Sequence, residues 1–221
     1  DLIGQAQTGT GKTCAYGIPA VEMTDRNAVT PQVLVLCPTR ELAMQVAEEL
    51  RRLTRFTHGL RILAVYGGQN IENQITALKK RPQIIIGTPG RVMDHMRRRT
   101  LRFDHLQMLV LDEADEMLNM GFREDIDTIL ADIPREKQML LFSATMAPEI
   151  MKLTEKYQRD PVLVRIARKE LTTDLTEQYY IEVREPSKIE LLCRLIDVNA
   201  VTLGLVFCNT KKRVDQVTAR L

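Results

Sequence analysis

Short runs of apolar residues alternate with longer amphipathic stretches along most of this chain, and no other feature constrains its fold as strongly. Because the runs are apolar throughout, they predict strands covered on both faces, as in a parallel sheet. The stretches between them are typical of helices; Leu42, Val46, Leu50 and Leu53 form one apolar stripe over 41–53. This alternation predicts a doubly wound α/β domain. The expected strands cover 2–3, 33–37, 62–65, 84–86, 108–111, 139–142 and 162–164.

The alternation changes after about residue 168, which predicts a domain boundary. Residues 171–178 are polar and rich in threonine, as linkers are. Beyond them we expect strands over 179–183 and 203–208, and helices over 187–196 and from Lys211 onward. Two strands and two helices are too few to enclose a core of their own. The predicted organisation is a first domain over 1–168, a linker over 169–178 and the start of a second α/β domain over 179–221.

Composition excludes several classes of protein. With 44% hydrophobic and 27% charged residues, the chain is neither disordered nor collagen-like. No uncharged apolar run approaches the roughly 18–20 residues that a membrane span requires. The first residues, Asp1 to Gly4, lack the pattern of a secretory leader. The formal net charge is only +2, so any nucleic-acid site must be a local patch.

The four cysteines lie far apart in the sequence and form no C-x-x-C pair. Two of them, Cys37 and Cys208, end apolar runs that predict buried strands, where a free thiol packs as a small hydrophobe. A reducing, cytoplasmic location is therefore expected. The histidines lack the spacing of metal ligands, so we expect His58, His95 and His105 to be ordinary surface or packing residues.

A glycine-rich segment follows the first expected strand and precedes an expected helix, which is the context of a phosphate-binding loop. Gly9 and Gly11 allow backbone N–H groups to turn toward phosphate oxygens, Lys12 can reach the β- and γ-phosphates, and the Thr13 hydroxyl can ligate Mg²⁺. One position departs from the general pattern, which has glycine where this chain has Ala6. The segment predicts that ATP and Mg²⁺ bind here, at Ala6, Gln7, Thr8, Gly9, Thr10, Gly11, Lys12 and Thr13.

An acidic tetrad, Asp112-Glu113-Ala114-Asp115, follows the expected strand over 108–111. Acidic runs are ordinarily solvated loops, but a buried strand before this one and a phosphate loop elsewhere favour an ATPase site. In such a site Asp112 holds Mg²⁺, usually through water, and Glu113 positions or deprotonates the attacking water. The expected catalytic residues are Lys12, Asp112 and Glu113, and the expected metal ligands are Thr13 and Asp112.

The tetrad resembles the signature of the DEAD-box ATP-dependent RNA helicases, in their bacterial form. The resemblance covers essentially the whole chain and includes the alanine at position 6. It implies a RecA-like ATP-binding domain over 1–168 and the start of a second RecA-like domain over 179–221. It also implies that the adenine-recognising motif lies before Asp1 and further motifs after Leu221, so that this chain alone hydrolyses ATP weakly. The matching motifs, in the family's order, are Ala6–Thr13, Pro38–Ala43, Gly67-Gly68, Thr88–Arg91, Asp112–Asp115, Ser143–Thr145 and Val206–Thr210.

Three of these motifs follow expected strands, at the edge where such sheets bind ligands. A helix N-terminus with a hydroxyl and a guanidinium beside it suits a phosphate; the less favoured alternative is that Thr39 is a simple helix cap. In the family these segments grip the RNA sugar–phosphate backbone, which implies single-stranded RNA or a short duplex as partner, bound without strong sequence preference. The resemblance assigns RNA contacts to Pro38, Thr39, Arg40, Gly67, Gly68, Thr88, Pro89, Gly90, Arg91, Asn209 and Thr210.

Ser143 and Thr145 carry short hydroxyl side chains that can reach the carboxylate of Asp115. In the family this motif couples hydrolysis to strand separation, which implies a coupling role for Asp115, Ser143 and Thr145. The alternative is that the hydroxyls cap a helix starting near Ala147. A basic run, Arg97 to Arg99 with Arg102, extends the RNA track or, as we favour, is a solvated helix end.

The sequence as a whole predicts an ATP-dependent RNA helicase that needs ATP and Mg²⁺. Two other functions stay open at this point: a non-catalytic protein- or RNA-binding module, and an ATPase directed by DNA. The sequence indicates no membrane contact and identifies no protein partner.

Overall fold

The computed structural model describes residues 1–7, 9–166, 177 and 179–221. Thr8 and, except for residue 177, the expected linker over 169–178 lie outside the described residues. The chain divides into two compact units, 1–169 and 170–221. In the part of the chain that the structure describes, no helix has the length and apolarity needed to cross a membrane.

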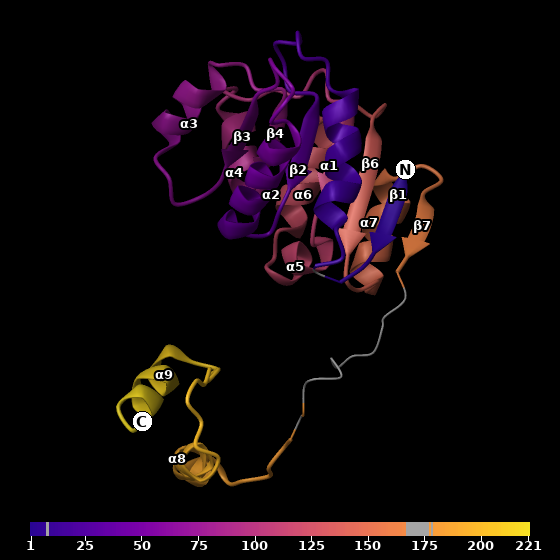
Figure 1. The fold of residues 1–221 in the computed structure, drawn as a ribbon. Helices are drawn as coiled ribbons and strands as arrows, with labels where there is room; N and C mark the ends of the chain where they lie inside the picture. The colour runs from indigo at the N-terminus through magenta and orange to yellow at the C-terminus, as the bar shows by residue number, and fades with distance from the viewer. Residues whose placement is uncertain (8, 167–176, 178) are drawn as a thin grey trace. The chain divides into compact units, whose positions relative to one another are not determined.

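The first unit contains a seven-stranded sheet with the order β3-β4-β2-β5-β6-β1-β7, in which all neighbours run parallel (Figure 1). This confirms the predicted doubly wound α/β fold. The strands lie where the apolar runs predict them, within one or two residues at each end. They are β1 (Leu2–Gln5), β2 (Val33–Leu36), β3 (Ile62–Val65), β4 (Ile84–Gly87), β5 (Met108–Leu111), β6 (Gln138–Ser143) and β7 (Val162–Arg165).

Helices cover both faces of the sheet, which explains why the central strands are apolar throughout. In β2, Val33 and Val35 pack with α1 and α2 on one face, whereas Leu34 and Leu36 belong to the core on the other face, with α4 to α7. Successive side chains of a strand point to opposite faces, so one strand serves both cores. The helices are α1 (Lys12–Met23), α2 (Arg40–Leu53), α3 (Ile71–Leu78), α4 (Pro89–Arg97), α5 (Ala114–Asn119), α6 (Arg123–Asp132) and α7 (Pro148–Tyr157).

The edge strand β7 differs from the prediction that every apolar run is covered on both faces. Its Val162, Leu163 and Val164 are 62%, 50% and 47% exposed. The reason is position: β7 is the last strand of the sheet and pairs with β1 alone among the described strands. Apolarity placed the strand correctly, but only the strand order decides whether it is central or peripheral.

The second unit is helical where it is described. It contains a short 3-10 helix, η1 (Glu185–Ser187), followed by α8 (Lys188–Val198) and α9 (Lys211–Thr218), which confirms the two expected helices. The expected strands over 179–183 and 203–208 are wrong: neither forms, and Tyr180, Leu205 and Phe207 are more than four-fifths exposed. A strand requires a neighbour to accept and donate its backbone hydrogen bonds. The described part of this unit provides no such neighbour, and Cys208, expected to be buried, is partly exposed.

Candidate functional site

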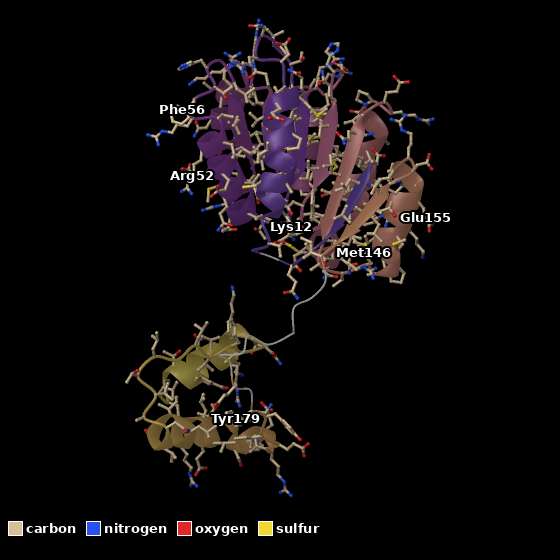
Figure 2. All side chains as sticks on the ribbon, turned by 45° about the vertical axis from the view of Figure 1, so that its right-hand side comes forward. Lys12, Arg52, Phe56, Met146, Glu155 and Tyr179 are labelled. Atoms are coloured by element: carbon tan, nitrogen blue, oxygen red, sulfur yellow. The ribbon has the colours of Figure 1, made fainter. Side chains whose placement is uncertain are left out.

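The phosphate loop joins β1 to α1 at the carboxyl edge of the sheet, the edge that the fold predicts for ligands. Gly9 and Gly11 adopt φ of +82° and +84°, a left-handed conformation that strains any other residue. Lys12 is the first residue of α1 and is nearly buried. Because α1 has no side-chain cap, its first N–H groups stay available to an anion. Figure 2 shows Lys12 at this end of the sheet, where Met146 also lies.

Asp112 lies directly after β5 and is 3% exposed. Its Oδ2 accepts a hydrogen bond of 2.8 Å from the Tyr16 hydroxyl, while its Oδ1 is buried and has no partner among the described residues. Burial raises the pKa of Asp112, although the Tyr16 bond and the Lys12 charge act in the opposite direction. A buried carboxylate oxygen without a partner calls for an explanation, and a magnesium-bound water supplies one. The donor set therefore fits Mg²⁺.

Tyr16 is a residue of this site that the sequence analysis missed. It lies one helical turn after Lys12 on α1, is fully buried and packs against Phe142 of β6, with ring centroids 5.4 Å apart. Burial and the Asp112 charge raise the pKa of its phenol far above the ordinary value, so the group remains a hydrogen-bond donor. Its spacing from Lys12 was the only available signal, and that signal does not reveal Asp112 as the acceptor.

Glu113 connects β5 to α5 with a φ of +52°, a left-handed conformation that is uncommon for glutamate. Such strain is held in place by the surrounding structure and is concentrated at functional sites. Burial and the neighbouring Asp112 charge raise the pKa of its carboxyl. A raised pKa brings this carboxylate closer to the range of an effective general base.

Thr145 connects the segment after β6 to the acidic tetrad. Its backbone N–H and its hydroxyl donate to Oδ2 of Asp115 at 2.9 and 3.0 Å, as expected from the sequence. Ser143 does not reach Asp115; its hydroxyl donates to the Thr145 carbonyl at 2.7 Å. The helix-cap alternative is wrong for both, because α7 begins after Ala147 without a side-chain cap. A coupling role for the three residues stays a prediction.

The segments with expected RNA contacts lie side by side, because β3, β4 and β2 are neighbours in the sheet. The Arg40 guanidinium lies 5.8 Å from the centre of the Tyr66 ring, close to the Gly67-Gly68 turn. Arg91 Nη1 donates to the carbonyl of Gln69 at 3.0 Å. The structure thus brings together, from three strand ends, the residues Pro38, Thr39, Arg40, Gly67, Gly68, Thr88, Pro89, Gly90 and Arg91.

Threonines stand at the start of both helices that face this edge. Thr39 Oγ1 accepts a hydrogen bond from Leu42 N at 3.2 Å. Thr39 therefore caps α2, which was the alternative interpretation of this residue from the sequence. Thr88 precedes Pro89 at the start of α4 and forms no side-chain cap, which leaves its hydroxyl available. Both helix N-termini present the positive end of a helix dipole to the same edge.

Two of the expected RNA contacts belong to the other unit, and the remaining residues are a basic run and a histidine of the first unit. Asn209 and Thr210 belong to the second unit, where Thr210 Oγ1 accepts from Arg213 N and caps α9. In the basic run, Arg98 pairs with Asp94 and is exposed, which favours the solvated helix end. His95 is fully buried, in agreement with a packing role.

A parallel sheet with a phosphate loop after its first strand and an acidic residue after a central strand defines the class of P-loop nucleotide-binding proteins. Within this class, residues 1–153 match the family model described as "DEAD/DEAH box helicase". The chain belongs to the DEAD/DEAH box helicase family.

Its relatives carry matching names. The chain is 54% identical to "ATP-dependent RNA helicase CshA" of Listeria monocytogenes and 53% identical to "DEAD-box ATP-dependent RNA helicase CshA" of Geobacillus kaustophilus. Both matches cover all 221 residues of this chain, but only 42% and 47% of the relatives. The chain thus spans less than half the length of these relatives.

Solved structures show the same fold. A DEAD box protein from the hyperthermophile Methanococcus jannaschii matches with a TM-score of 0.73 and 42% identity, over 99% of this chain and 58% of that one. A hypothetical ATP-dependent RNA helicase from Sulfolobus tokodaii matches with a TM-score of 0.68 and 34% identity, over 75% of this chain and 48% of that one. The first unit is a RecA-like domain.

Proposed function

We propose that this chain is the ATP-binding portion of an ATP-dependent RNA helicase that hydrolyses ATP to separate short RNA duplexes. One observation carries the proposal: Tyr16, from the phosphate-loop helix, holds one oxygen of Asp112 and leaves the other buried oxygen without a partner among the described residues. The two halves of an ATPase site, from distant parts of the sequence, therefore meet in one geometry.

Each residue has a role that follows from its position. The N–H groups at the start of α1 and the ammonium of Lys12 bind the β- and γ-phosphates. Thr13 and Asp112 hold Mg²⁺, which when bound neutralises charge that develops on the phosphates. Glu113 orients the attacking water and accepts its proton. The Thr145–Asp115 hydrogen bonds transmit the state of this site toward the RNA-binding edge.

RNA binds along the edge formed by the ends of β2, β3 and β4. The helix N-termini at Thr39 and Thr88, the backbone of Gly68 and Gly90, and the guanidinium groups of Arg40 and Arg91 contact sugar and phosphate. Such contacts carry no sequence information, so we expect little sequence preference. Residues 1–168 form the ATP-binding domain and 179–221 begin a second domain, which contributes Asn209 and Thr210. The free cysteines found in the structure suit a reducing, cytoplasmic location.

The test is ATP hydrolysis by the 221-residue chain with and without single-stranded RNA. We expect slow hydrolysis that Glu113→Gln abolishes, and nucleotide binding that Lys12→Ala weakens at least about tenfold, equivalent to 1.4 kcal/mol. Lys137→Ala is the matched control, because Lys137 donates to the Pro134 carbonyl and has no place in the phosphate loop. Hydrolysis is expected to be slow because an arginine finger contributes about 10³–10⁵ in rate in P-loop NTPases, and the residues proposed here for the ATP site include no arginine.

Other outcomes would favour other functions. RNA binding that persists while neither Lys12→Ala nor Glu113→Gln changes any measured property would indicate a non-catalytic module. Equal competition by DNA and RNA oligomers would indicate an enzyme directed by DNA, since an RNA-specific site senses the 2′-hydroxyl. Robust duplex unwinding by this chain alone would contradict the expectation of weak activity.

A further inference from the structure

Gln74 of α3 is a buried glutamine that uses both ends of its amide. It is 2% exposed. Its Nε2 donates to the Tyr66 carbonyl at 3.0 Å and to Gln69 Oε1 at 2.7 Å. Its Oε1 faces Arg91 Nη1 at 3.1 Å and His95 Nε2 at 2.9 Å. Two acceptors on one side and donors on the other fix the orientation of the amide.

This orientation also fixes the tautomer of His95. Because Gln74 Oε1 can only accept, His95 Nε2 must carry a hydrogen and donate it. On the other side of the ring, Nδ1 pairs with Thr100 Oγ1 at 2.8 Å. A continuous hydrogen-bonded chain therefore runs from Thr100 through His95 and Gln74 to Arg91, and no member of it belongs to the ATP site.

This series of hydrogen bonds ends at the guanidinium of Arg91, in which one nitrogen is hydrogen-bonded and one edge has no partner among the described residues. Both hydrogens of Arg91 Nη1 are used, by the Gln69 carbonyl and by Gln74 Oε1. Across the described residues, no partner is found for Arg91 Nε or Nη2. The Nε–Nη2 edge is a planar fork that matches two oxygens of a phosphate. A fork already held in place loses less conformational entropy when it binds.

We infer that Gln74 is a positioning residue for RNA: it holds Arg91 and the 66–69 turn in one geometry, so that the free edge of the guanidinium meets a backbone phosphate. This inference rests on the proposed RNA-binding function and deepens it. Gln74 does not touch RNA itself; it acts through Arg91, directly and by holding the turn whose Gln69 carbonyl accepts from Arg91 Nη1. His95 Nε2 donates to Gln74 Oε1 and so helps to hold the Gln74 amide in place.

The test compares two buried glutamines. Gln83 is fully buried, donates to the carbonyls of Arg26 and Ala28 and accepts from Arg61 N, at the opposite end of β4. We expect both Gln74→Met and Gln83→Met to lower the unfolding temperature. Only Gln74→Met should weaken binding of a fluorescein-labelled oligouridylate by the 221-residue chain, by about tenfold, with ATP affinity unchanged.

A double-mutant cycle separates positioning from general loosening. If Gln74 acts through Arg91, Gln74→Met should weaken RNA binding no further in an Arg91→Ala background. Loss of one phosphate contact should also reduce the slope of log affinity against log salt by about 0.7 for single-stranded RNA. Should Gln74→Met fail to fold, His95→Phe removes the supporting donor and should give a smaller loss in the same direction, again only when Arg91 is present.

The outcomes are distinguishable. Absence of RNA binding by the unaltered chain would overturn the proposed function and this inference with it. RNA binding that Gln74→Met leaves unchanged, losses that add in the double variant, or an equal loss in Gln83→Met would overturn the inference alone.

Discussion

The two units of this chain contain similar apolar runs, but a run of the first unit forms a buried strand and a run of the second unit is exposed and forms no strand. In the first unit the run 108–111 is β5, between β2 and β6, and Leu109 is completely buried. In the second unit the run 203–207 forms no strand, and Leu205 is 81% exposed. The residues are of the same kind; the difference is whether parallel neighbours and covering helices are present. An apolar run therefore becomes a buried strand only where the rest of the fold provides neighbouring strands and covering helices.

The largest expected effect tests this difference directly. Leu109→Ala should destabilise the chain by about 2–5 kcal/mol, because it removes packed methyl groups and leaves a cavity in the core. Leu205→Ala should change stability by less than about 0.5 kcal/mol, because its side chain is already in water. Urea unfolding followed by circular dichroism measures both. Comparable losses in the two variants would show that the second unit packs its apolar run in solution.

A second pair compares tyrosines that donate to carboxylates. The Tyr16 hydroxyl bonds buried Asp112 at 2.8 Å, and the Tyr179 hydroxyl bonds exposed Glu177 at 2.7 Å. Tyr16→Phe should cost about 1–3 kcal/mol, since it leaves a second buried carboxylate oxygen without a partner. Tyr179→Phe should leave the urea midpoint unchanged, because water replaces the lost donor. If Tyr16→Phe left the free energy of unfolding unchanged, water would have to reach Asp112 in solution and replace the lost donor.

The smallest effect concerns ion pairs. Burial alone would raise the pKa of Asp127, but bonds from Tyr157, Arg123 and Lys156 hold it below its ordinary value. Since the folded pKa is the lower one, this carboxylate stabilises the fold above its unfolded pKa, and the stabilisation is lost as pH falls through the folded pKa. Asp127→Asn should therefore cost about 0.5 kcal/mol near neutral pH, after allowance for solvent screening.

The pH dependence supplies the check. The difference between Asp127→Asn and the unaltered chain should stay constant from about pH 7 to about pH 5 and shrink only as the pH falls below about 3.9, the pKa of an unfolded aspartate, toward about pH 3. In the second unit, a hydrogen bond from Lys188 and the charge of Arg213 likewise lower the pKa of Glu185, but this group is fully exposed. Glu185→Gln should show no measurable change at either pH. If the stability difference between Asp127→Asn and the unaltered chain did not vary with pH, the effect of the substitution would be one of packing and not of charge.

Sequence alone determined the local features of this protein. The apolar runs predicted the strand positions of the first unit, which the structure confirms, because each position depends on residues within one short segment. The glycines, Lys12 and the acidic tetrad likewise form short local motifs, and their role in nucleotide chemistry stays a prediction. The resemblance to the helicase family rested on the same local motifs, and the family match over 1–153 confirms it.

Only the tertiary structure decided which distant residues meet. The Tyr16–Asp112 bond joins residues 96 positions apart, and the contact of Gln74 with Arg91 joins two helices. The exposure of β7 and the absence of strands over 179–183 and 203–208 among the described residues depend on neighbours, not on the runs themselves. The physical reason is the same in each case. Composition sets what a segment can bury or donate, whereas burial and hydrogen bonding are completed by partners that the sheet order alone places within reach.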